Sequence, residues 1–218
     1  MTIASRWIIG LRGPGLALAL LALAVPAHAT TLKRMDLSEL VRGADRVVHA
    51  RAAGTRVYWD PSGTQIYTDT RFEVVEEAKG RGPRTLTLTT LGGRMGEVVM
   101  SVEGTPAFEQ GSEAVLFTAA APDGRRHLVG FSQGVMRVIE DSRTGDRFAV
   151  SETPAGVTVM ERTGTGLAPV RPRRQRASLP QLLDEIRRIA QGEPAGPRLL
   201  SRPQKAAGAA PAPQEGRP

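Results

Sequence analysis

The sequence predicts a mainly β protein, an antiparallel barrel or sandwich with a short helix before it and an amphipathic helix after it. Seven to nine short runs of strand-forming residues lie between residues 46 and 160. Gly, Pro and Asp clusters separate these runs, and no long helical pattern lies between them. A parallel α/β fold is disfavoured because parallel strands need crossover helices.

The first 29 residues have the pattern of a secretory signal peptide. Two arginines precede an unbroken apolar run at 16–25, and the segment ends with Ala-His-Ala at 27–29. This pattern predicts cleavage after Ala29 and a mature chain in the periplasm or outside the cell. Ten apolar residues rise only about 15 Å as a helix, too little for a bilayer core of ~30 Å. No later apolar run approaches spanning length, so we expect no transmembrane segment in the mature chain.

The elements of the predicted domain follow in order. Asp36 and Glu39 have capping-box spacing, which predicts a short helix. Residues 46–59 predict a strand that ends in the turn Asp60-Pro-Ser-Gly63, and residues 64–76 alternate apolar and polar side chains as a half-buried return strand does. Further strands are expected at 84–91, 97–102, 113–119, 126–131, 134–140, 146–150 and 157–160.

The C-terminal helix is predicted at 178–190. Ser178 is expected to cap it with Gln181 completing a capping box, and the arginines near its end suit the helix dipole. Its apolar residues recur at helical spacing: Leu179, Leu182, Leu183, Ile186 and Ile189. We expect this stripe to pack on the β domain. The alternative is a helix that binds a membrane or a partner.

Charge and composition divide the mature chain. Residues 30–167 contain 17 Lys/Arg and 18 Asp/Glu, whereas residues 168–218 contain 10 and 4. A nearly neutral domain lacks the field that nucleic-acid binding requires, so we expect no nucleic-acid partner. The organisation predicted is a β domain at 30–161, a basic linker at 162–177, the helix at 178–190 and a disordered tail at 191–218.

The chain contains no cysteine. This excludes a disulfide scaffold, a thiolate zinc site and a cysteine nucleophile.

Several motifs resemble those of a known group. Residues 44–51 (ADRVVHAR), 72–80 (FEVVEEAKG) and 104–111 (GTPAFEQG, running into VLF at 115–117) occur in this order. They resemble a widespread group of uncharacterised secreted bacterial proteins and, more distantly, the netrin-like domain of tissue inhibitors of metalloproteinases. The resemblance implies an OB-like β-barrel over residues 36–160.

The resemblance does not carry the inhibitory chemistry over. Those inhibitors chelate the protease zinc through an N-terminal cysteine. Here the expected mature N-terminus is Thr30, and the chain has no cysteine.

Residues 130–134 read Gly-Phe-Ser-Gln-Gly, which matches the G-x-S-x-G pattern of serine hydrolases. A nucleophilic Ser132 would need a strand before it, a helix after it and a histidine base. A strand-like segment follows instead, and the mature histidines, His49 and His127, both precede Ser132. The other interpretation is that the two glycines allow a bulge or a tight bend in a barrel strand.

The sequence gives little indication of a metal or cofactor. Two mature histidines do not make a His-rich site, although carboxylates could complete one. Asp60, Asp69 and Glu73 lie near the first hairpin, but Asp69 and Glu73 share one strand face and their spacing is sparser than in calcium loops. We therefore expect no cofactor and no metal.

Two groups of residues are candidates for binding. Tyr58, Trp59 and Tyr67 gather around the first hairpin, either as a binding surface or as a cross-strand packing cluster. A basic cluster lies in the expected linker and either contacts an anionic polymer or lipid or is a solvated linker. It consists of Arg171, Arg173, Arg174 and Arg176.

The function that these observations favour is a non-enzymatic binding or accessory module for another envelope or secreted protein. A serine hydrolase centred on Ser132 is one alternative. A polyanion or membrane-surface binder acting through the basic C-terminal segment is another. The partner and the oligomeric state are not indicated by the sequence.

Overall fold

A computed structural model describes residues 30–164, 166–170 and 174–196. The expected signal peptide, most of the expected C-terminal tail, and Arg171 and Arg173 lie outside the described residues. No helix in the described part of the chain is long and apolar enough to cross a membrane.

The fold is mainly β and its large sheet is antiparallel, as the sequence predicts. Eight strands form this sheet in the order β13-β10-β9-β7-β2-β3-β4, with β8 paired to β7. Their bounds are β2 Arg46–Trp59, β3 Ile66–Lys79, β4 Thr85–Leu91, β7 Glu113–Ala120, β8 Arg126–Leu128, β9 Val135–Glu140, β10 Arg147–Ser151 and β13 Gln175–Ser178. No ladder of backbone hydrogen bonds closes these described strands into a barrel.

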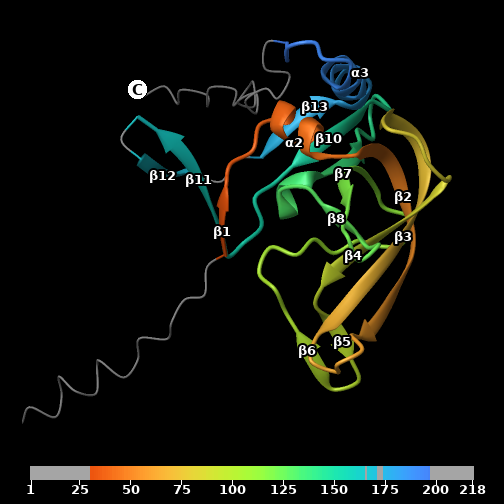
Figure 1. Ribbon diagram of the computed structural model, residues 1–218. Helices are drawn as coiled ribbons and strands as arrows, with labels where there is room; N and C mark the ends of the chain where they lie inside the picture. The colour runs from red at the N-terminus through yellow and green to blue at the C-terminus, as the bar shows by residue number, and fades with distance from the viewer. Residues whose placement is uncertain (1–29, 165, 171–173, 197–218) are drawn as a thin grey trace, which may run out of the picture.

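Two smaller sheets complete the β structure. Strand β1 (Thr30–Lys33) runs parallel to β11 (Val157–Thr163), which pairs with β12 (Gly166–Val170). Strands β5 (Gly93–Met95) and β6 (Val98–Met100) form a short hairpin. The helices α2 (Leu37–Gly43) and α3 (Leu179–Ala190) gather at one end of the large sheet, and the β5–β6 hairpin lies at the opposite end (Figure 1).

The prediction of a linker at 162–177 is wrong for the residues that the structure describes there. These residues contribute to β11, β12 and β13, and β13 extends the large sheet by pairing with β10. Strand β1 was also not predicted. Backbone pairing with β11 and β10, both distant in sequence, overrides the weak local propensity of the short strands β1 and β13.

The large sheet buries both of its faces near the helices. Neighbouring residues in a strand point to opposite faces. Accordingly, Val115 and Phe117 of β7 pack in a core with the two helices, whereas Ala114 and Leu116 pack in a second core with Phe72. The edge-to-face ring of Phe108 lies 4.9 Å from the Phe72 ring and extends this second core.

Helix α2 begins with the predicted capping box. The Asp36 carboxylate accepts from the Glu39 N–H at 2.8 Å, and the Glu39 carboxylate accepts from the Asp36 N–H at 2.9 Å. At the other end, the ammonium of Lys79 donates to the carbonyls of Val41 and Ala44, both at 2.6 Å. A cation at the C-terminal end of a helix stabilises the helix dipole.

Helix α3 packs with its predicted stripe inward. All five aliphatic residues of the stripe are buried, and the helix contacts α2, β3, β10 and β13. Two details differ from the expectation. The Ser178 side chain makes no capping hydrogen bond, and Ser178 is also the last residue of β13. Glu185 is also buried, and its carboxylate accepts from Arg188 and from the Gly196 N–H.

We predict that Leu182→Ala lowers the free energy of unfolding by about 2–5 kcal/mol, because Leu182 is fully buried and truncation leaves a cavity. Leu167→Ala is the matched control, since Leu167 is 60% exposed and its truncation is expected to cost no more than about 0.5 kcal/mol. Chemical denaturation of both variants measures this. Equal stability of the two variants would show that α3 does not dock on the sheet.

Candidate binding surface

The predicted aromatic residues lie at the turn end of the β2–β3 hairpin, beyond the point where β2 stops pairing with β7. Tyr58 and Tyr67 are direct cross-strand partners, and their rings stack with centroids 6.1 Å apart and planes at 28°. Trp59 pairs with Ile66 at the last position of the ladder. We call residues 54–71, which form this part of the hairpin, the ribbon end.

Two arginines extend the tyrosine pair into a four-member ladder. The Arg56 guanidinium lies 5.7 Å from the centre of the Tyr58 ring, and the Arg125 guanidinium lies 4.2 Å from the centre of the Tyr67 ring. Both distances are within the range of cation–π attraction. The two tyrosines therefore pack against each other across the strands, each with an arginine over its ring. Trp59 is the most exposed of the three predicted aromatic residues.

The ladder is anchored by Asp69. Its Oδ1 accepts from the Tyr58 hydroxyl at 3.2 Å and from the Thr89 hydroxyl at 2.6 Å. Burial raises the pKa of Tyr58, and the negative charge of Asp69 raises it further. Tyr58 thus remains a neutral hydrogen-bond donor at physiological pH.

The turn between β2 and β3 is held by one carboxylate. Asp60 accepts from the Ser62 hydroxyl and from the backbone N–H groups of Gln65 and Thr64 at 2.8 and 2.7 Å. These hydrogen bonds lower the pKa of Asp60 to about 2. The turn is therefore internally bonded without help from the protein core.

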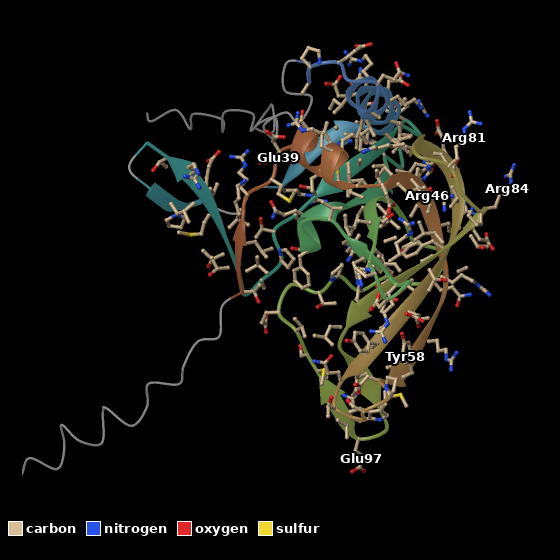
Figure 2. All side chains as sticks on the ribbon, viewed as in Figure 1. Glu39, Arg46, Tyr58, Arg81, Arg84 and Glu97 are labelled. Atoms are coloured by element: carbon tan, nitrogen blue, oxygen red, sulfur yellow. The ribbon has the colours of Figure 1, made fainter. Side chains whose placement is uncertain are left out.

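Exposed apolar side chains lie at this end of the molecule. Trp59 is 37% exposed, and Val98 and Val99 of β6 are 49% and 54% exposed. We call these three residues the apolar tip. Figure 2 places Glu97 at the extremity of the β5–β6 hairpin and Tyr58 above it on the ribbon end. No local pattern in the sequence distinguishes the exposed Val98 and Val99 from the buried adjacent pair Val47 and Val48.

Strand β5 approaches the ribbon end closely. A Cβ atom on Gly93 would lie 2.7 Å from both Thr68 Oγ1 and Val57 Cγ1, and Gly93 has a φ of +147°. The Thr68 hydroxyl also donates to the Gly92 carbonyl at 2.7 Å. Only glycine fits here, so β5 supports one face of the ribbon end and holds the β5–β6 hairpin in place.

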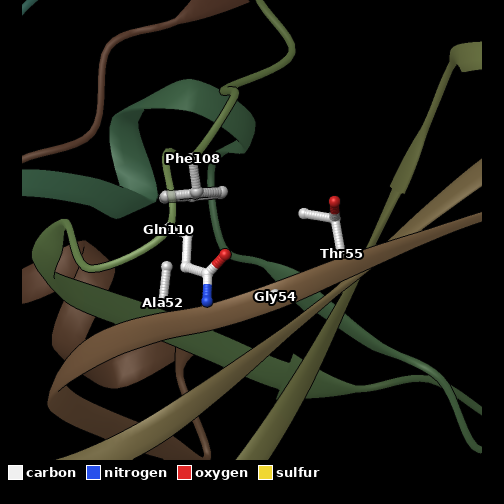
Figure 3. A pocket seen from close by; sticks show the side chains of 5 residues that line it. All are labelled: Ala52, Gly54, Thr55, Phe108 and Gln110. Atoms are coloured by element: carbon white, nitrogen blue, oxygen red, sulfur yellow. The ribbon is translucent and has the colours of Figure 1, made fainter.

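A small cavity of about 70 Å³ lies at the start of the ribbon end. Figure 3 shows Phe108, Gln110 and Ala52 toward one side of it and Thr55 toward the other, with Gly54 between them. The register of β2 and β3 shifts between Ala52 and Gly54. A bulge at this point bends the strand away from its neighbour and leaves the cavity.

His49 belongs to a separate ionic cluster formed by residues of β2, β7 and β10. Its Nε2 lies 2.7 Å from Glu113 Oε2, and His49 is 1% exposed. Arg51 donates to the other oxygen of Glu113 at 2.7 Å, and Arg147 pairs with Glu113. Burial raises the pKa of Glu113, but hydrogen bonds from Arg51 and His49 and the charge of Arg147 outweigh it and lower the pKa overall.

Ser132 lies in the short 3₁₀ helix η1 (Phe131–Gly134) and is followed by strand β9. In the described part of the chain, Ser132 forms no hydrogen bond with either histidine. The glycine at position 134 is explained by packing, since a Cβ atom there would lie 2.3 Å from the Val129 carbonyl oxygen. His127 lies across the strands from Thr89, with Nδ1 3.3 Å from the Thr89 carbonyl.

The other predicted groups are dispersed. Asp60 and Asp69 serve the separate networks described above, and the described residues hold no cluster of three or more His, Asp or Glu side chains suited to a metal ion. In the basic cluster, Arg174 pairs with Glu152 at 2.8 Å. Arg176 lies 3.4 Å above the centre of the Phe148 ring.

No protein-family model matches the chain, and no curated protein or solved structure shows significant similarity to it.

We predict that Glu113→Gln destabilises the protein by about 1–3 kcal/mol at pH 7, because it leaves positive groups without their shared carboxylate. The pKa of Glu113 is lowered from 4.5 on folding. Its contribution is therefore complete above about pH 4.5 and is lost as the pH falls through the lower folded value.

Urea unfolding of the wild type and of Glu113→Gln between pH 3 and 7 checks this. The difference between them should shrink below about pH 4.5. Glu109→Gln, at an exposed position, is the control and should follow the wild type at every pH. A constant difference across the range would contradict the assignment.

Proposed function

We propose that this protein is a non-enzymatic binding or accessory module of the bacterial envelope that attaches to another secreted or envelope protein through the apolar tip. In this proposal the segment before Thr30 is a signal peptide removed after Ala29. The chain then acts in the periplasm or outside the cell.

The observation that supports binding is the exposure of the apolar tip on a supported scaffold. Trp59, Val98 and Val99 are large apolar side chains left in solvent at one end of the described structure. The bonded Asp60 turn and the glycine contact of β5 hold their backbone in place. Exposed apolar groups on a rigid support are typical of protein-binding sites, and tryptophan is enriched among residues that dominate binding energy.

We further propose that the sheet is an OB-like barrel. Strands β4 and β8 are in contact although no ladder joins them, and the His127–Thr89 contact lies between them. This proximity supports a barrel that is open at the β4–β8 seam. OB-like barrels serve as binding modules in many contexts, which agrees with the proposed role.

We predict that Trp59→Ala combined with Val99→Ser abolishes capture of the partner without unfolding the protein. The full chain with a C-terminal tag is expressed in a bacterial host, and cross-linked partners are recovered from the envelope and culture fractions. The variant should lose a partner that the wild type captures, because both substitutions remove exposed apolar area from the tip.

Leu167→Ala is the matched control, because Leu167 is more exposed than any tip residue but lies on β12. It should retain the partner. Capture that survives the tip variant, or that the control loses equally, would overturn the proposal. Esterase activity that disappears in Ser132→Ala would also overturn it, in favour of the hydrolase.

A further inference from the structure

Strand β2 loses its partner on one side halfway along its length. Its pairing with β7 ends at Arg51 opposite Glu113, and the Ala52 N–H and carbonyl then bond to the loop at Ser112 and Gly111, both at 2.8 Å. Its pairing with β3 continues to Trp59. From residue 54 onward, β2 is therefore the free edge of the three strands β2, β3 and β4.

The hydrogen-bond pattern shows which backbone groups face this edge. The Gly92 N–H donates to the Ile66 carbonyl, so Ile66, Thr68 and Thr70 direct their backbone groups toward β4. Because backbone groups alternate along a strand, Tyr67 and Asp69 direct theirs toward β2. Their partners Tyr58 and Arg56 are thus bonded to β3. It follows that Thr55, Val57 and Trp59 direct their N–H and carbonyl groups outward.

Nothing in the described part of the chain bonds to these outward groups. Neither backbone nor side-chain hydrogen bonds reach Thr55, Val57 or Trp59 from the side away from β3. The edge has the sequence Thr-Arg-Val-Tyr-Trp, rich in β-branched and aromatic residues and without proline. Such an edge is a template for another strand, and proteins usually block edges that are not used.

We propose that an extended segment of the partner protein adds to this edge as a further strand along Thr55–Trp59. This inference rests on the proposed function and specifies how the partner is held. Backbone hydrogen bonds to the three outward residues supply affinity, and side-chain contacts supply specificity, as in other complexes formed by strand addition.

The side chains beside the edge define the chemistry of the partner strand. On one face lie Val57 and Trp59, with the cavity beside Phe108 at the start of the edge. On the other face lie Tyr58 and the exposed Arg56. A strand that alternates apolar and acidic residues matches both faces, because its apolar side chains meet the first and its carboxylates meet the arginine.

The test uses backbone and side-chain variants at one position. Thr55→Pro removes one outward N–H that β3 does not use, and proline is tolerated at strand edges. Thr55→Ala is the matched control, since it shortens the side chain and keeps the N–H. The probe is a seven-residue synthetic peptide in which valine alternates with glutamate, compared with one in which lysine replaces glutamate.

Thr55→Pro should weaken peptide binding by about tenfold, as expected for losing one backbone hydrogen bond and the fit around it. Thr55→Ala should stay within about threefold of the wild type. The lysine peptide should bind at least about tenfold more weakly than the glutamate peptide. Fluorescence anisotropy with the full chain measures all four affinities.

Amide hydrogen exchange gives a second readout that needs no variant. In the free protein, the amides of Arg56 and Tyr58 should exchange slowly and those of Thr55, Val57 and Trp59 quickly. Binding of the glutamate peptide should slow exchange at the latter three. Protection that does not alternate, or no change on binding, would overturn the inference.

Further outcomes separate this inference from the proposed function. Thr55→Pro that binds as the wild type does, while the tip variant loses its partner, would overturn strand addition and leave the proposed function standing. A dimer in sedimentation experiments that Thr55→Pro dissociates would show that a second copy occupies the edge, and would overturn the assignment to a partner.

Discussion

The double use of strand β2 is the constraint on which the rest of the structure depends. Its first half is hydrogen-bonded to β7 and β3, and its second half is bonded to β3 alone. Buried backbone groups require partners, so the first half lies within the core and the second half lies in solvent, as the change in burial along β2 shows. Val47 of β2 lies in the core beneath the helices, Val48 and Ala50 lie in the second core, and the second half of β2 forms one strand of the ribbon end.

Local sequence patterns predicted the elements whose stabilisation is local. The alternation in residues 64–76 predicted β3, the Asp-Pro-Ser-Gly turn predicted the hairpin, and the spacing of Asp36 and Glu39 predicted the start of α2. Strands β1 and β13 were not predicted, because each is a four-residue strand stabilised by a partner more than twenty residues away. Composition indicated a linker at 162–177, but pairing with the distant strand β10 makes β13 part of the large sheet.

In the candidate site, too, the sequence predicts the local features but not the contacts between distant residues. The aromatic hairpin was visible in the sequence, since Tyr58 and Tyr67 flank a strong turn signal. The cation beside Tyr67 comes from Arg125, and the carboxylate beside His49 comes from Glu113, so neither contact follows from local spacing. The free edge of β2 is harder still to predict, because it depends on where the pairing with β7 ends. No motif in β2 itself indicates that point.

The ribbon end can bind a strand without reorganising the core, because its order comes from its own contacts. The Asp60 turn fixes one extremity, the arginine–tyrosine ladder holds the register, and Gly93 brings β5 against one face. A preorganised edge loses little conformational entropy on binding, so more of the hydrogen-bond energy appears as affinity. The bulge between Ala52 and Gly54 and the charge of Arg56 limit the edge to a short, charged segment. These are features by which proteins discourage unspecific edge pairing, so the residues of β2 itself restrict which segments its open edge accepts.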